Sequence, residues 1–151
     1  MWQKFRNLVR NVSTYQALSP DLRIRRRVNS WLGDRSPLSQ DKWAAVLRES
    51  WGISRAVASF AYTHLEQYSG LQVARLRPSD RLDDDLQWAH VCWFDWQLCL
   101  CDDFCRRFGV DISDRLDQLT PSTVADLLVF LEKQLHRSST ADLPCDDSSC
   151  P

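Results

Sequence analysis

The cysteine thiols of this sequence are its first candidates for metal binding or nucleophilic catalysis. Four of the six cysteines fall within residues 86–109, at Cys92, Cys99, Cys101 and Cys105. Cys101 and Cys105 are one helical turn apart, a spacing at which two thiolates could share a metal ion, but a zinc site needs further ligands from a second segment. The alternative is that they are small core hydrophobes, as buried cysteines usually are. We expect this second role, with no metal bound.

A catalytic use of these thiols would need a histidine held close by the fold, because the histidine must take the thiol proton. Nothing in the sequence positions His64, His90 or His136 for that role. The four glycines are far apart, which leaves no glycine-rich loop to hold a phosphate. The consecutive aspartates at 83–85 could bind a hard cation, although adjacent side chains in a turn diverge. The sequence therefore predicts no catalytic residue and no cofactor.

Charge is distributed unevenly along the 151 residues, although the net charge is only -1. Residues 1–36 hold eight basic and two acidic side chains, giving 8 − 2 = +6, so the remainder carries −7. Arg23, Arg25, Arg26 and Arg27 form the densest basic patch. Such a patch is usually a solvated face, and binding of phosphate or of an acidic partner is the sharper alternative. The near-zero net charge gives no reason to expect nucleic acid.

The segment of residues 2–17 has the pattern of an amphipathic helix and contains no acidic residue. Its apolar positions recur at helical spacing: Trp2, Phe5, Leu8, Val9 and Val12. Three interpretations stay open, namely a helix that docks on the body, an organelle transit peptide, and a helix lying on a membrane surface. We expect the first, and weak membrane contact through residues 2–27 is the main alternative.

The cysteine pattern and the absence of long apolar runs bear on the cellular compartment in which the protein is expected. No apolar run approaches the ~18 residues that a membrane span requires. Closely spaced helical cysteines do not make a secreted disulfide framework, and no secretory signal pattern precedes them. We therefore expect a reducing compartment, the cytoplasm.

Helix start and stop signals recur along the chain, and no segment has a convincing strand pattern, which predicts an all-α fold. One helix is expected over residues 22–32. Ser39 is expected to cap the next helix, which ends at Gly52. Ser54 is expected to cap a third, which ends at Gly70.

Composition also predicts the domain organisation. Gly33–Pro37 has the composition of a linker. We therefore expect residues 1–36 to be a basic helical extension and residues 37–137 to be a helical domain that folds without it. The polar, acidic residues 138–151 are expected to be a disordered tail.

The longest apolar pattern predicts one central helix that begins near Leu86 and ends at Gly109. Its buried stripe is expected to contain the residues at steps of three and four: Val91, Phe94, Leu98, Cys101, Cys105 and Phe108. Thr120 and Pro121 are expected to open the last helix as cap and first residue.

From Ile53 to about Leu135 the sequence resembles an acyl carrier protein. The resemblance lies in three short runs and their order, Asp84–Leu86 before the central helix, Phe108–Ile112 after it, and Thr123–Leu127 at the start of the last helix. The family resemblance implies a four-helix carrier-like body over residues 53–135. It is closest in kind to bacterial carrier-like proteins that lack the family's modified serine.

That serine takes the phosphopantetheine arm in the family, at the start of the central helix. Counting back from Phe108, the matching position here is Phe94, and the run from Leu86 to Phe94 is about four residues longer than in the family. Residues 80–112 contain no Ser or Thr. A phosphodiester cannot form without a hydroxyl, so the resemblance implies the fold without the carrier chemistry.

The side of the central helix opposite the predicted stripe is the candidate partner site. It carries Asp95, Trp96, Asp102, Asp103 and Arg106, together with Cys92 and Cys99. In carrier proteins the acidic face beside the serine is what partner enzymes bind, and an exposed tryptophan among acids is a typical anchor. The alternative is that the basic helices cover this face, with Arg25–Arg27 near Asp102 and Asp103.

These observations lead us to expect a non-catalytic, carrier-like adaptor that binds an unidentified protein partner. Two alternatives remain open: a genuine acyl or peptidyl carrier modified at a non-standard residue, and a peripheral membrane protein that uses the basic N-terminal helices.

Overall fold

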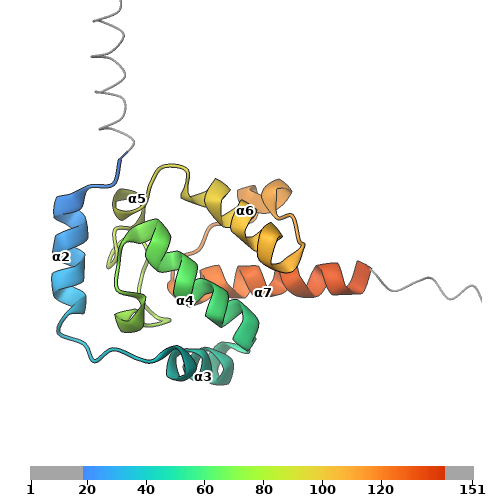
Figure 1. Cartoon of the computed structure of the whole chain (residues 1–151), viewed down its shortest axis with the longest axis horizontal. Helices are drawn as coiled ribbons and strands as arrows, with labels where there is room; N and C mark the ends of the chain where they lie inside the picture. The colour runs from blue at the N-terminus through green and yellow to red at the C-terminus, as the bar shows by residue number, and fades with distance from the viewer. Residues whose placement is uncertain (1–18, 142–151) are drawn as a thin grey trace, which may run out of the picture.

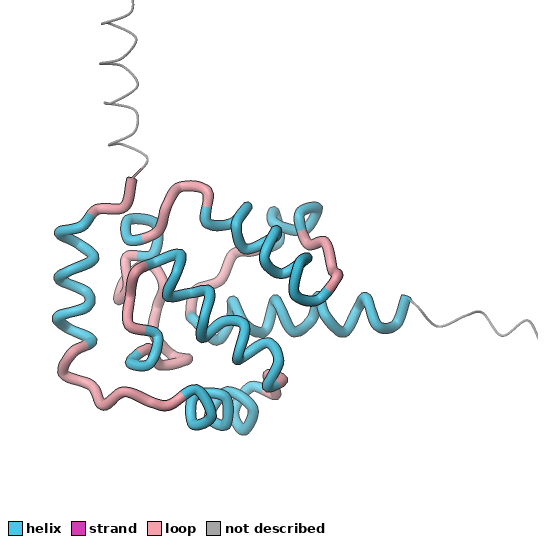
Figure 2. Tube along the Cα trace, viewed as in Figure 1, coloured by secondary structure: helices cyan, strands magenta, loops and turns pink. Residues whose placement is uncertain are grey.

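The structure is a computed structural model that describes residues 19–141. Its α-helices are α2 (Leu22–Leu32), α3 (Gln40–Trp51), α4 (Arg55–Ser69), α5 (Trp88–Val91), α6 (Trp96–Phe108) and α7 (Val124–Ala141). Two 3-10 turns, η1 (Val73–Arg75) and η2 (Ser113–Gln118), complete the elements (Figure 2). Within residues 19–141 there is no strand, only an isolated bridge between Arg81 and Thr123. The prediction of an all-α fold is confirmed.

Capping chemistry fixes the ends of α3 and α4. The side chain of Ser39 accepts the Lys42 N–H at the start of α3, and the side chain of Ser54 accepts the Val57 N–H at the start of α4. Gly52 and Gly70 end these helices in the left-handed conformation, with φ of 66° and 65°. Both helices, and α2, lie where the sequence predicts them.

Helix α4 lies at the centre of the fold, where it contacts α3, α6, α7 and η1 (Figure 1). Its buried residues are Val57, Ala58, Phe60, Ala61, Leu65, Tyr68 and Ser69. The connection after α4 adds Leu71, Val73 and Leu76, all with no exposed surface. The core is therefore organised around α4 rather than around the segment from Leu86 to Gly109.

The predicted long central helix is wrong, because the chain breaks between α5 and α6. Cys92 is in an extended conformation, and α6 begins only at Trp96. The carbonyl of Val91 accepts a hydrogen bond from the Arg25 guanidinium at 2.7 Å, so it serves a tertiary contact instead of a continuing helix. The break resets the helical phase, and a stripe counted from Val91 does not follow the buried side of α6.

Several stripe positions are consequently corrected. Phe94 and Leu98 are 65% and 60% exposed, and Cys105 is also exposed. Leu100 and Phe104, which the predicted stripe omits, have no exposed surface. The corrected buried side of α6 thus contains Leu100, Cys101 and Phe104.

The last helix begins and ends later than predicted. Thr123, not Thr120, is the cap: its hydroxyl accepts the Asp126 N–H, and the Asp126 carboxylate accepts the Thr123 N–H. Helix α7 continues to Ala141, beyond the predicted boundary at 137. The remaining predicted tail and the predicted helix at residues 2–17 lie outside the described residues.

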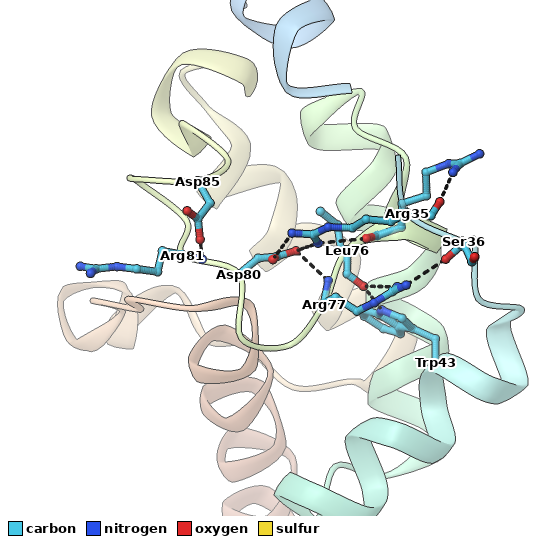
Figure 3. A network of polar contacts seen from close by, with 9 residues as sticks. Arg35, Ser36, Trp43, Leu76, Arg77, Asp80, Arg81 and Asp85 are labelled. Carbon is cyan, nitrogen blue, oxygen red and sulfur yellow. Dashed lines mark hydrogen bonds and ion pairs between the residues drawn. The ribbon is translucent and has the colours of Figure 1, made fainter. Parts of the chain in front are cut away.

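The predicted linker is attached to the body by a buried ion pair (Figure 3). Arg35 donates to both carboxylate oxygens of Asp80, at 2.8 and 2.9 Å, and Asp80 also accepts the Arg77 N–H at 2.7 Å. In α2, Val28 and Leu32 are 3% and 0% exposed. The part of residues 1–36 that the structure describes therefore contributes Val28 and Leu32 to the core.

Candidate functional site

Three exposed large apolar side chains lie close together in the sequence, just before α6 and in its first turn, and we call them the apolar patch: Trp93, Phe94 and Leu98. Their exposed fractions are 44%, 65% and 60%. Other exposed large hydrophobic side chains in the described residues are spread over α2 and α3: Leu22, Trp31, Val46 and Trp51. Exposed apolar side chains that lie singly are ordinary, whereas a contiguous group is typical of an interaction site.

The apolar patch lies within an acidic stretch. Residues 82–105 contain no Lys or Arg and six aspartates, Asp83, Asp84, Asp85, Asp95, Asp102 and Asp103. The pKa of Cys99 reflects this field: partial burial raises it, and the carboxylates of Asp95, Asp103 and Asp102 raise it further. Asp95 and Asp102, the aspartates of this stretch that are nearest to the patch residues along α6, therefore favour a positively charged partner there.

Of the predicted partner-binding residues, Asp95 and Asp102 lie close to this patch. Asp95 is half-buried at the N-cap position of α6 without capping the helix through its side chain, and Asp102 is exposed. Trp96 is half-buried and packs edge-on against Trp88, with ring centroids 5.9 Å apart. Trp96 is therefore not the expected exposed anchor.

The exposed aromatic side chains are those of Trp93 and Phe94, which the sequence reasoning did not assign to the site. A signal for them was present, since an aspartate is a common helix cap. Taking Asp95 as the cap would have started the helix at Trp96 and left both aromatics in the preceding turn.

Asp103 faces α4 instead of solvent, which corrects its predicted role. Its carboxylate accepts the Tyr68 hydroxyl at 2.7 Å and lies 3.3 Å from Nδ1 of His64. Burial, and then the hydrogen bond to Asp103, raise the pKa of Tyr68, so this hydroxyl stays protonated and donates. Arg106 is largely exposed and lies 3.6 Å from the other Asp103 oxygen. This cluster attaches α6 to α4.

The predicted basic patch lies against α5 and not against the face of α6. Arg25 donates to the Val91 carbonyl at 2.7 Å, and Arg27 donates to the Gln87 side chain at 3.2 Å. Arg23 and Arg26 are exposed. The contacts of Arg25 and Arg27 are thus with α5 and the residue before it, and not with Asp102 and Asp103 as in the alternative considered above.

A groove of about 530 Å³ lies on one side of α6. Trp88 and Trp96 line it together with Asp83, Asp84 and the loop of residues 119–122. Trp88 is buried, and its indole Nε1 has no hydrogen-bond partner within the described chain. Arg81 also lines the groove and pairs with Asp84 at 2.8 Å, so the groove carries charge of both signs.

The described cysteines differ in environment. Cys92 and Cys101 are buried, and burial raises the pKa of both thiols, which keeps them protonated and weakly nucleophilic. Cys105 is exposed, contrary to its predicted place in the core. In residues 19–141 no three His, Cys, Asp or Glu side chains converge so as to hold a metal ion.

No protein-family model matches this chain, and no curated protein or solved structure is significantly similar to it. Among the described helices, none combines the length and apolar character needed to cross a membrane.

Proposed function

We propose that this protein is a non-catalytic interaction module, built on a scaffold like that of an acyl carrier protein, which binds a protein partner through the apolar patch. The single observation that carries the proposal is the exposure of Trp93, Phe94 and Leu98 within six consecutive residues of an acidic stretch. Burying large apolar side chains against a partner removes their surface from water, which is the main favourable contribution to association.

The order of elements supports the carrier-like part of the proposal. Helix α4 is followed by a long connection that contains η1 and the four-residue helix α5, then by α6, the 3-10 turn η2 and α7; apart from α5, this is the order that the resemblance implies. Phe94 stands immediately before Asp95, the N-cap residue of α6. The position that would hold the family's serine is thus at a helix start, and it carries an exposed phenyl ring instead of a hydroxyl.

This substitution changes what the position can do. A phenyl ring cannot form the phosphodiester bond to a phosphopantetheine arm, but it can enter an apolar pocket of a partner. We infer that the site that would carry a cofactor in a carrier protein is here a direct protein contact.

The environment of the described cysteines supports a non-catalytic role. Nucleophilic cysteines have lowered pKa values, whereas the pKa values of Cys92, Cys99 and Cys101 are raised, with desolvation as the largest cause. His64, on α4, lies 3.3 Å from the Asp103 carboxylate.

Quantitative affinity capture from the native host tests the partner site. The double variant Phe94→Asn/Leu98→Gln should lose a protein that the wild-type chain retains. The matched control is Val46→Asn/Trp51→Gln on α3, where the two side chains are 37% and 40% exposed. If both variants keep the wild-type melting temperature but lose or retain the same proteins, the apolar patch is not the binding site.

Intact-mass measurement distinguishes the proposal from a genuine carrier. The chain is co-expressed with a phosphopantetheinyl transferase, and we expect no added mass. Addition of the arm at any residue would show that the protein is a carrier after all, and peptide mapping would identify the residue.

A further inference from the structure

The start of α2 places the preceding chain beside α5, and the apolar patch follows α5 in the sequence. The Asp21 N–H donates to the His90 carbonyl at 2.8 Å, and Arg25 donates to the Val91 carbonyl at 2.7 Å. Figure 1 shows the N-terminal end of α2 beside α5. Because Trp93 follows His90 by only three residues, the eighteen residues before Ser19 continue from a point close to the patch.

The composition of residues 1–18 is complementary to that surface. This segment contains Lys4, Arg6 and Arg10 and no acidic residue, whereas residues 82–105 contain six aspartates and no Lys or Arg. Its apolar side chains, Trp2, Phe5, Leu8, Val9 and Val12, recur at helical spacing. The segment therefore offers an apolar side for the patch and positive charge for the surrounding carboxylates.

We propose that residues 2–17 cover the apolar patch in the protein that has no partner bound. Their apolar side chains contact Phe94 and Leu98, and their basic side chains lie near Asp95 and Asp102. The segment is long enough to lie along α6, because its 16 residues span roughly 24 Å even as a helix, against roughly 20 Å for the 13 residues of α6.

One consequence rests on the proposed function. If a partner binds the same patch, it must displace residues 2–17, and its apparent affinity is reduced by the fraction of molecules in the covered state. The segment would then select partners that supply more apolar contact or more positive charge than it does itself.

Photo-crosslinking in the full chain tests the covering without any partner. A benzophenone-bearing phenylalanine replaces Phe94, and in a second protein it replaces Leu98 in case the first is unstable. After irradiation, mass spectrometry should find the crosslinks within one molecule, at residues 2–17. The matched control places the same group at Trp51, which is 40% exposed on α3, on the opposite side of the molecule from α5 in Figure 1.

Charge variants of the crosslinking protein test the electrostatic part. Asp95→Lys with Asp102→Lys should lower the crosslink yield several-fold, because like charges then face each other. Asp114→Lys with Asp117→Lys, at two exposed positions of η2, makes the same change in net charge and should leave the yield unchanged.

Several results would overturn the proposal: no crosslink from either patch position to residues 2–17, an equal yield from Trp51, or crosslinks that join only separate molecules. The last result would show that a second copy supplies the segment. None of these results bears on capture of a partner by the patch, so failure of this inference and failure of the proposed function can be told apart.

Discussion

Arg35 and Asp80 form a two-point ion pair across 45 residues of sequence, at the junction between the α2–α3 connection and the loop after η1. The Asp80 side chain is only 6% exposed, and it also accepts the Arg77 N–H. The Asp80 carbonyl accepts the Val124 N–H at the start of α7. Asp80 therefore joins the α2–α3 connection, the loop after η1 and the start of α7. Figure 3 shows its side-chain contacts with Arg35 and with the Arg77 N–H.

Removing the charge of Arg35 should lower the free energy of unfolding by more than removing the charge of an exposed arginine does, although Arg35 lies in a loop. Arg35→Met leaves the buried Asp80 carboxylate without its counter-charge, and loss of one partner of such a pair costs about 3 kcal/mol of the free energy of unfolding. Urea denaturation measures this. The control is Arg81→Met, whose ion pair with Asp84 has both side chains more than 60% exposed, and which should cost less than ~1 kcal/mol. Equal losses would show that the Arg35–Asp80 pair does not support the fold.

Deleting residues 1–36 should abolish cooperative unfolding, contrary to the expectation from sequence. The deletion removes the buried side chains of Val28 and Leu32 along with Arg35. Loss of large buried side chains costs about 2–5 kcal/mol each, and a domain is stable by only about 5–15 kcal/mol. The control, deletion of residues 1–18, removes no described side chain and should keep a cooperative transition. Thermal unfolding followed by circular dichroism compares the two, and a cooperative transition in the shorter protein would restore the linker boundary.

The helix ends that the sequence predicts correctly are those set by local chemistry. Ser39 and Ser54 each accept a backbone N–H three residues later, and Gly52 and Gly70 each take a conformation that other residues avoid. All of this lies within one helical turn of the residue concerned. The ends of α3 and α4 can therefore be predicted from the residues at those ends alone.

The contact that stabilises the break after α5 could not be predicted in this way, because it involves a distant residue. Arg25, 66 residues away, occupies the Val91 carbonyl, and the apolar periodicity continues across the break; the local sign of the new helix start is the aspartate at position 95. The error then changed the candidate site, since a continuous helix buries Phe94 and Leu98 and exposes Asp103. The acidic character of the segment, which depends only on composition, was evident from the sequence.

The described thiols should react in the order of their burial. Cys105, which is exposed, should be alkylated fastest at about pH 8. Cys92 and Cys101 should be slowest, because burial both blocks access and raises the pKa of their thiols. Cys99, half-buried among carboxylates, should fall between them. Peptide mapping after timed alkylation resolves each site, and unfolding in urea should equalise the rates. Protection of Cys105 in the folded chain would instead support the stripe predicted from sequence.

Gly70 should be far less tolerant of alanine than Gly52, although both have a left-handed backbone. The φ angles are 65° and 66°, so each Gly→Ala change carries a similar conformational cost of about 1 kcal/mol. At Gly52 a new Cβ meets nothing within 4 Å, whereas at Gly70 it would lie 2.7 Å from the Arg25 guanidinium. Gly70→Ala must therefore displace Arg25 and weaken its hydrogen bond to Val91, which adds about 1 kcal/mol or more.

A double-mutant cycle separates the two costs at Gly70. In an Arg25→Ala background the obstructing side chain is gone, so Gly70→Ala should cost no more than Gly52→Ala does in either background. The coupling energy from urea denaturation should then be about 1 kcal/mol, in the direction that makes the double variant more stable than the sum of the single changes predicts. Additive changes would mean that Arg25 does not pack over Gly70.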